Sequence, residues 1–465
     1  MIWLNKNADM LGNHNVKGLL IKLSLPAIAG MAMNALYNFV DTLFVGRGAG
    51  EIAIGGLALA FPVQMIVMAV GLMVGMGSAS IFSRAFGEKD TLRMHAAVNT
   101  ALVLDVFLAI LFTVLGFLFI DKLLVFFGAT SSNIIFAKDY LSIILIGLVP
   151  LSLSMVLNNL TRAEGRAKVA MISMLIGTGL NVILDPIFIF DFGFGLGVQG
   201  AAIATVISQI IAFIYIFIQA NGKHSSLNIT LKDGILLDFK MMKEIILIGA
   251  PTFLRNATGA FLSIIIYRLI NYYSTGDPAI YISIYGVINR VLTFVFMPAF
   301  GIVQGLAPIV GFNYGAKKEQ RLLDVIVYAM KIIIIYFFFG FLFIQLLATS
   351  IFTMFSPNSN LEFITIGSQA FRILSIGFLL VGFQVIVSSI YQSEGFPLRA
   401  TMIALSRQVF FFIPLVYLFT YLLGIEGIWI SFAASDILAG LLSMILFFLE
   451  MKKIRNNLAL EPARI

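Results

Sequence analysis

The sequence contains no cysteine, only three histidines, and only 11% charged residues. Without cysteine there can be no disulfide and no thiolate ligand. His14, His95 and His224 lie far apart in polar segments, so neither a zinc site nor a Cys–His nucleophile can be assembled. Soluble domains carry about 25% charged residues, and this chain has too few to coat a water-facing surface. We therefore expect a membrane protein that is not an enzyme and has no cofactor.

Long apolar runs dominate the sequence, of which 60% is hydrophobic. A helix needs about 20 apolar residues to span a bilayer. Dividing the runs at turn residues and charge clusters predicts twelve such helices, which makes the chain an all-α integral membrane protein. The predicted spans are residues 19–45, 53–80, 96–120, 140–160, 168–190, 197–219, 245–271, 279–309, 323–350, 363–390, 399–421 and 427–449.

Basic residues are distributed unequally between the two sides of the predicted membrane. Outside the spans and at their ends, nearly all Lys and Arg residues fall in the two termini and in every second connection. The three exceptions are Arg47, Lys122 and Lys138. By the positive-inside rule both termini lie in the cytoplasm of a multi-pass plasma-membrane protein. The net charge of +7 thus reflects topology and gives no reason to expect a nucleic-acid partner.

The two halves of the sequence repeat each other in order. Leu141–Gly147 aligns with Phe371–Gly377, and at the same offset Glu164-Gly165 aligns with Glu394-Gly395. Each copy holds six spans and enters the membrane in the same direction, so a pseudo-twofold axis along the membrane normal should relate two six-helix bundles around a cavity. We expect a functional monomer with an N-terminal lobe (1–220), a linker (221–244) and a C-terminal lobe (245–465).

A polar stripe runs along the first predicted span at helical spacing, and a second one lies in the fifth span. The stripes consist of Asn34, Tyr37, Asn38 and Asp41, and of Asn181 and Asp185. An Asp inside a membrane helix costs about 2.5–3.5 kcal/mol, so two of them indicate a function. Burial and a second carboxylate both disfavour the charged form, and at least one proton should be held near neutral pH. Asp41 and Asp185 are therefore candidate H⁺ sites, or metal ligands if Na⁺ is the coupling ion.

The polar stripes also have other interpretations. The two Asp residues could form a structural knot between helices, or Asp41 could sit at the outer interface just before Gly46-Arg47. Asn158 and Thr205 are candidate hydrogen-bond donors to the site, and Asp105 is unassigned. The positions of the second copy that match Asp41 and Asp185 are apolar, near Ile266 and Leu415, so coupling should belong to the first lobe.

The second lobe carries cationic residues inside its predicted spans. Arg255, Arg290 and Arg407 could contact an anionic group of a substrate, or Arg255 or Arg407 could pair with Asp436 or helix-end carbonyls. Methionine is abundant in the first lobe, and flexible thioethers suit a pocket for varied apolar shapes, although they also serve as lipid-facing or core residues. Candidate cavity residues are Met33, Met65, Met155 and Met174, together with Asn34 and Asn38.

Several motifs in this order resemble the multidrug and toxic compound extrusion family, in its DinF-like prokaryotic branch. They are Ser24-Leu-Pro26, Tyr37–Gly46, Arg162-Ala-Glu-Gly165, Asn181–Pro186 and Gly200–Thr205. The resemblance implies two six-helix bundles around a V-shaped, outward-opening cavity. It also implies that Asp41, Asn181, Asp185 and Thr205 form the coupling network, with Tyr37, Asn158 and Tyr140 near it and Tyr140 facing the substrate cavity. Another branch has acidic residues in helices 7 and 10, where this chain offers Arg255, Asn256 and Gln384.

We therefore expect an antiporter that exports amphipathic, often cationic, organic compounds in exchange for H⁺ or Na⁺. The alternative from a related superfamily role is a flippase for lipid-linked oligosaccharide or peptidoglycan precursors, whose pyrophosphate the arginines of the second lobe would grip. A membrane enzyme would need a nucleophile–base pair or a metal cluster, which the sequence does not offer.

Overall fold

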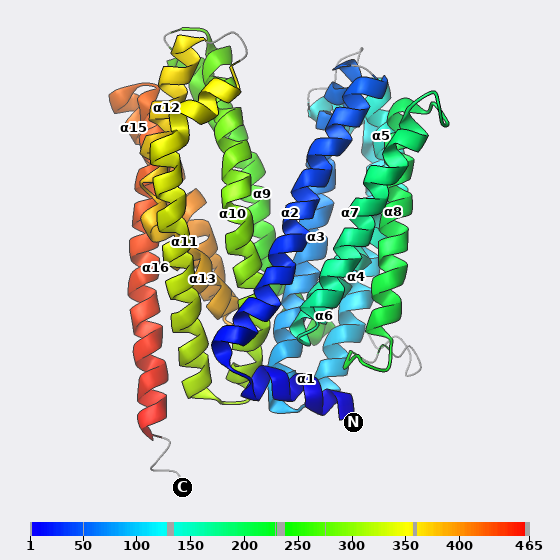
Figure 1. Cartoon of the computed structure of the whole chain (residues 1–465), viewed down its shortest axis with the longest axis vertical. Coiled ribbons are helices and arrows are strands. Elements are labelled where there is room, and N and C mark those ends of the chain that lie inside the picture. Colours follow the sequence, from blue (N-terminus) through cyan, green and yellow to red (C-terminus); the bar gives the residue numbers. More distant parts are fainter. Residues whose placement is uncertain are drawn as a thin grey trace.

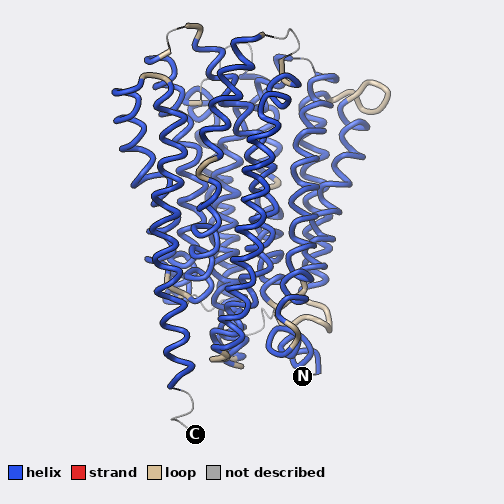
Figure 2. The backbone as a smooth tube through the Cα atoms, turned by 60° about the vertical axis from the view of Figure 1, so that its left-hand side comes forward, coloured by secondary structure: helices blue, strands red, loops and turns tan. Residues whose placement is uncertain are grey.

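The computed structural model describes residues 2–49, 51–127, 134–227, 229, 238–274, 276–356 and 360–460. This part of the chain is almost entirely helical and contains no strand (Figure 2). The helices of the first half are α1 (Ile2–Asn13), α2 (Val16–Ala49), α3 (Glu51–Glu88), α4 (Thr91–Phe126), α5 (Ile134–Ile146), α6 (Leu148–Ala163), α7 (Ala167–Ile189) and α8 (Gly197–Ala220). Those of the second half are α9 (Phe239–Tyr273), α10 (Pro278–Gly315), α11 (Glu319–Met354), α12 (Leu361–Ser375), α13 (Phe378–Glu394), α14 (Pro397–Leu405), the π-helix η1 (Ser406–Phe412), α15 (Ile413–Leu423) and α16 (Glu426–Leu460).

The described residues form twelve spans, as the apolar runs predicted. Ten helical segments are each long and apolar enough to cross a membrane. Two bent pairs complete the set: α5 with α6, bent by 54°, and α12 with α13, bent by 51°. Both bends fall at glycines that the internal repeat aligns, Gly147 and Gly377. The fourth span of each half is thus broken at the same place, which supports the duplication.

Helices α2–α8 form one bundle and α9–α16 the other (Figure 1). The bundles meet at the end of the molecule that carries both termini, where α2 packs on α10 and α3 packs on α9, and they diverge toward the opposite end. Two glycines permit these contacts, because a Cβ on Gly77 would overlap the carbonyl oxygen of Ile245, and a Cβ on Gly305 would overlap Ser24. The two crossings are equivalent in the repeat, so they follow the pseudo-twofold axis.

The short helix α1 was not predicted, because it is too short to span a bilayer. It lies across the end of the molecule where the bundles meet (Figure 1). Leu11 is completely buried. Second-lobe side chains donate to the carbonyls that end this helix: Lys318 Nζ to Gly12 at 2.9 Å, and Arg321 Nη2 to His14 at 2.8 Å. Cations at a helix C-terminus are favourable, so α1 is held by the second lobe.

A buried carboxylate follows α6 directly. Glu164 accepts from Arg166 Nη1 at 2.9 Å and from the backbone N–H of Ser226 at 2.6 Å, and it has no exposed surface. These contacts join the turn between α6 and α7 to the segment after α8. Burial raises the pKa of Glu164 from 4.5 to about 7, although Arg166 and the Ser226 N–H act in the opposite direction.

This raised pKa predicts a pH dependence of stability. The contribution of Glu164 to folding is complete below about pH 4.5 and is lost as pH rises through 7, by roughly 3 kcal/mol at most. Thermal unfolding midpoints of the detergent-solubilised protein at pH 5 and pH 8 would measure it. We expect Glu164→Gln to flatten part of the decline, and an unchanged pH slope in this variant would contradict the assignment.

Candidate functional site

Asp41 of α2 and Asp185 of α7 meet inside the first bundle, where these two helices pack along each other. Asp41 is 7% exposed and Asp185 is fully buried. The two carboxyl groups are close enough to interact electrostatically. Among the described residues, Asp41 Oδ1 and both oxygens of Asp185 find no hydrogen-bond donor. Asp41 is therefore buried against Asp185 and does not sit at an exposed interface.

Hydroxyl groups from two further helices, α5 and α8, and polar side chains of α2 and α7 complete this cluster. Asn181 Nδ2 donates to Thr205 Oγ1 at 3.1 Å, and the Tyr37 and Thr205 hydroxyls lie 3.5 Å apart. Tyr140 of α5 is also buried and lies close enough to Asp41 to interact with it electrostatically. The structure thus brings together six residues that the sequence singled out, from α2, α5, α7 and α8. We call them the aspartate cluster: Tyr37, Asp41, Tyr140, Asn181, Asp185 and Thr205.

The chemistry of the aspartate cluster fits a small cation. Buried carboxylate oxygens without donors are costly, and a proton bound to the pair or a cation between the two carboxylates would remove that cost. Carboxylate, amide and hydroxyl oxygens are the ligands that hard cations such as Na⁺ take. The oxygen ligands of the cluster therefore suit both H⁺ and Na⁺. The described residues contain no group of three or more His, Asp or Glu side chains that could hold another metal ion.

Two other predicted polar residues have partners elsewhere. Asn158 Nδ2 donates to the carbonyl of Ser154 on its own helix at 2.8 Å, and the described hydrogen bonds do not link it to the aspartate cluster. Asp105, unassigned from the sequence, accepts from Ser152 Oγ at 2.6 Å between α4 and α6. Asp105 therefore belongs to the packing of these two helices.

The candidate cavity residues are distributed over several environments. Met174 packs against Gly30 and accepts from Arg162 Nη2 at 3.1 Å. Met33, Asn34 and Met155 are half-buried, and Met65 is 37% exposed. The side chain of Asn38 lies outside the described residues. Their contact with a substrate stays a prediction.

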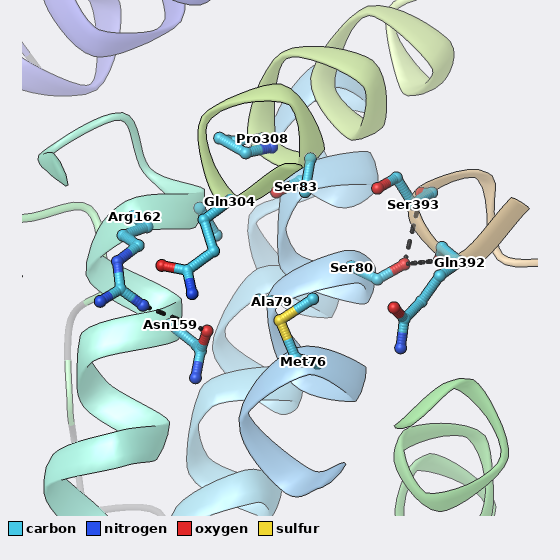
Figure 3. A pocket seen from close by; sticks show the side chains of 12 residues that line it. Met76, Ala79, Ser80, Ser83, Asn159, Arg162, Gln304, Pro308, Gln392 and Ser393 are labelled. Atoms are coloured by element: carbon cyan, nitrogen blue, oxygen red, sulfur yellow. Dashed lines mark hydrogen bonds between the residues drawn. The ribbon is translucent and has the colours of Figure 1, made fainter. Parts of the chain in front are cut away.

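A small cavity of about 30 Å³ lies where the two bundles meet (Figure 3). Each bundle contributes two helices to it: α3 and α6 from the first, α10 and α13 from the second. Its polar side chains include Ser80, Ser83, Asn159, Arg162, Gln304 and Gln392. This interlobe cavity was expected from the duplication, but its residues were not.

Arg162 is the cavity residue whose environment differs most from the sequence-based prediction. The predicted spans place it in the connection after the fourth span, whereas α6 continues to Ala163 and buries Arg162, which is only 7% exposed. The positive-inside pattern concealed it, because a basic residue at the predicted end of a span looks like a topology signal. The one sequence signal that Arg162 is more than a topology residue is its place in the Arg162–Gly165 motif.

The second-lobe arginines differ from one another. Arg407 lies in η1, where the wider helical turn precedes Pro414, and its Nε pairs with buried Asp436 at 2.5 Å, as one of the alternatives predicted. Arg255 lies over the ring of Phe300 at 5.1 Å, and Arg290 is exposed.

Both neutral side chains at the positions where another branch has acids donate to backbone carbonyls. The amide of Asn256 donates to Thr252 and that of Gln384 to Ile403. Neither position therefore offers a carboxylate for a cation.

Comparisons with known proteins agree with this architecture. The profile of the MatE family matches residues 26–187 and 251–418. The multidrug export protein MepA of Staphylococcus haemolyticus is 26% identical over 450 residues, covering 96% of this chain and 95% of MepA. MepA of Staphylococcus aureus strain MRSA252 is 26% identical over 448 residues and 96% of each chain.

Solved structures match over the same extent. A crystal structure of a MATE protein in the bent conformation superimposes with a TM-score of 0.88 at 26% identity, covering 98% of this chain and 99% of that one. An outward-facing multidrug resistance MATE transporter of the MOP superfamily gives 0.87 at 25% identity, covering 97% and 99%. The resemblance drawn from the motifs is confirmed, and this chain belongs to the MatE family.

Proposed function

We propose that this protein is a secondary antiporter that exports amphipathic, often cationic, organic compounds in exchange for H⁺ or Na⁺. Membership of the MatE family makes the chain a transporter and not an enzyme. The curated relatives are multidrug export proteins, which supports multidrug efflux and does not favour the flippase alternative.

The observation that carries the coupling mechanism is the buried pair of Asp41 and Asp185. Two carboxylates side by side in a low-dielectric environment repel each other, so a bound proton or Na⁺ stabilises the pair. Release of that cation restores the repulsion between the two carboxylates. Thr205, Asn181 and Tyr37 connect this change to α2, α7 and α8 through their hydrogen bonds. Cation binding from outside would thus alter the packing of α2, whose other face contacts the second bundle through α10.

The ion gradient supplies enough free energy for this exchange. One pH unit is worth ~1.4 kcal/mol per proton. A membrane potential adds ~2.3 kcal/mol per elementary charge and 100 mV. Either contribution is sufficient for a tenfold accumulation ratio.

The orientation, the lobes and the oligomeric state complete the proposal. Basic residues gather at the end that carries both termini, which supports a cytoplasmic location of that end in the cell membrane. The bundles would then be closed toward the cytoplasm and open outward. We propose lobes of residues 1–220 and 245–465 joined by 221–244, and a functional monomer, because each lobe contributes to the same interlobe cavity.

Dye efflux from proteoliposomes tests the function. Purified protein is reconstituted with a fluorescent cationic dye, and pH and Na⁺ gradients are imposed separately. We expect uphill dye movement with one or both gradients and none when the gradients are collapsed by ionophores. Equal dye movement with and without any gradient would contradict antiport.

A further inference from the structure

We infer that the interlobe cavity contains a binding site for a carboxylate group, built on Arg162 and separate from the aspartate cluster, which accepts the anionic end of a zwitterionic substrate. This inference rests on the proposed export function and assigns a substrate feature to it. The guanidinium of Arg162 lines the cavity and is directed into it beside Asn159 and Gln304 (Figure 3).

Arg162 has only neutral partners among the described residues. Its Nη1 donates to Asn159 Oδ1 at 3.4 Å and its Nη2 to the thioether of Met174 at 3.1 Å, while its buried Nε has no acceptor. A sulfur and one long hydrogen bond compensate poorly for the desolvation of a buried guanidinium. A planar carboxylate that accepts two parallel N–H bonds is the group that matches a guanidinium best.

The nearby acid does not neutralise Arg162. Glu164 is two residues away, but both of its oxygens are engaged by Arg166, Ser225 and the N–H of Ser226. No described carboxylate lies within ion-pair distance of Arg162. The positive charge therefore remains available to a ligand in the cavity.

The fold does not require a cation at this place. The internal repeat aligns Arg162 with Gln392, which lines the same cavity from the other bundle. Gln392 Nε2 donates to the carbonyl of Ile248 at 2.9 Å and to Thr252 Oγ1 at 3.0 Å, so a neutral amide satisfies the equivalent position. Because an amide is sufficient for packing in one copy, the charge in the other copy indicates binding.

The surroundings specify what else the ligand carries. Met76 lines the cavity, Met174 contacts Arg162, and Met31 contacts Gln304, so thioethers lie around the guanidinium. Flexible thioethers accept varied apolar bodies. A carboxylate next to an apolar body fits these surroundings, and the proposed export of cationic compounds adds the cationic group.

Two matched dyes test the site in the full-length protein. Rhodamine 110 carries a free carboxylate, and rhodamine 123 is its methyl ester with the same cationic ring system. Binding to detergent-solubilised protein is measured by fluorescence anisotropy. We expect Arg162→Gln to weaken the binding of rhodamine 110 by at least about tenfold and to change the affinity for rhodamine 123 by less than about threefold. Arg162→Lys, which keeps the charge and loses the planar fork, should fall between wild type and Arg162→Gln for rhodamine 110.

Arg372→Gln is the matched control, because it removes another guanidinium, one that donates to the Gln345 carbonyl and the Thr349 hydroxyl and does not line the interlobe cavity. It should affect both dyes alike. An equal loss of affinity for both dyes in Arg162→Gln would overturn the inference and make Arg162 a packing or gating residue. Competition of rhodamine 110 by free acetate in wild type, without discrimination between the dyes, would also overturn it in favour of a site for small inorganic or organic anions.

The proposed export function is tested separately from this site. Gradient-driven efflux of rhodamine 123 by Arg162→Gln should persist. If the dyes are not distinguished while efflux of rhodamine 123 persists, the carboxylate site is wrong and the export function stands. If no dye moves against any gradient in wild type, the export function itself is wrong.

Discussion

Replacing Asp185 by Asn should reduce gradient-driven dye export by at least about tenfold, and Asp41→Asn should do the same. Each variant keeps the size of the side chain and removes one of the two carboxylates, so the repulsion that a bound proton or Na⁺ relieves is lost and the ion is held by a single carboxylate. Export is measured in proteoliposomes under an imposed pH or Na⁺ gradient, with the amount of reconstituted protein matched between variants.

Asp105→Asn is the control for this experiment. Asp105 is as buried as Asp185, but it accepts from Ser152 outside the aspartate cluster. Asp105→Asn should leave gradient-driven export intact. A loss of export equal to that of Asp185→Asn would mean that removing any buried acid impairs transport and that the aspartate cluster has no special role. Full gradient-driven export by both Asp41→Asn and Asp185→Asn would contradict the mechanism.

Gly77→Ala should destabilise the closed contact between the bundles and stop transport. The added Cβ overlaps the carbonyl oxygen of Ile245 on α9, and backbone cannot move aside as a flexible side chain can. We expect a loss of stability of about 3 kcal/mol or a separation of α3 from α9. The thermal unfolding midpoint and dye export would both fall.

Gly286→Ala is the matched control for this substitution. Gly286 is a helical glycine of α10 whose Cβ would meet no atom within 4 Å. It should be tolerated or slightly stabilising, since Ala has the higher helix propensity. Normal stability and transport in Gly77→Ala would show that the crossing of α3 and α9 is not as close as described.

The spans and the aspartate cluster could be predicted from the sequence for physical reasons. A bilayer demands long apolar segments, and the cost of Asp41 and Asp185 within them indicates a function. Helical spacing placed Tyr37 and Asp41 on one face, and the motif order of the resemblance supplied Thr205 and Tyr140. The bends at Gly147 and Gly377 were not predicted, because a single glycine within an apolar run does not by itself mark a break.

The remaining features depend on tertiary structure that no local pattern encodes. The pairing of Arg407 with Asp436 was one of several alternatives until α16 was placed beside η1. Arg162 looked like a connection residue, because the end of a helix is uncertain by a few residues in any apolar run that fades into polar sequence. Helix α1 is stabilised by Lys318 and Arg321 from the other half of the chain, which local propensity cannot reveal.

Ion flux driven by a dye gradient tests the central claim most directly. Vesicles loaded with dye are diluted into dye-free medium, and the movement of H⁺ and of Na⁺ in the opposite direction is measured for wild type and for the double variant Asp41→Asn/Asp185→Asn. We predict that wild type moves one of these ions as dye leaves and that the double variant moves neither. Dye-driven ion movement in the double variant at the wild-type rate would place coupling outside the aspartate cluster.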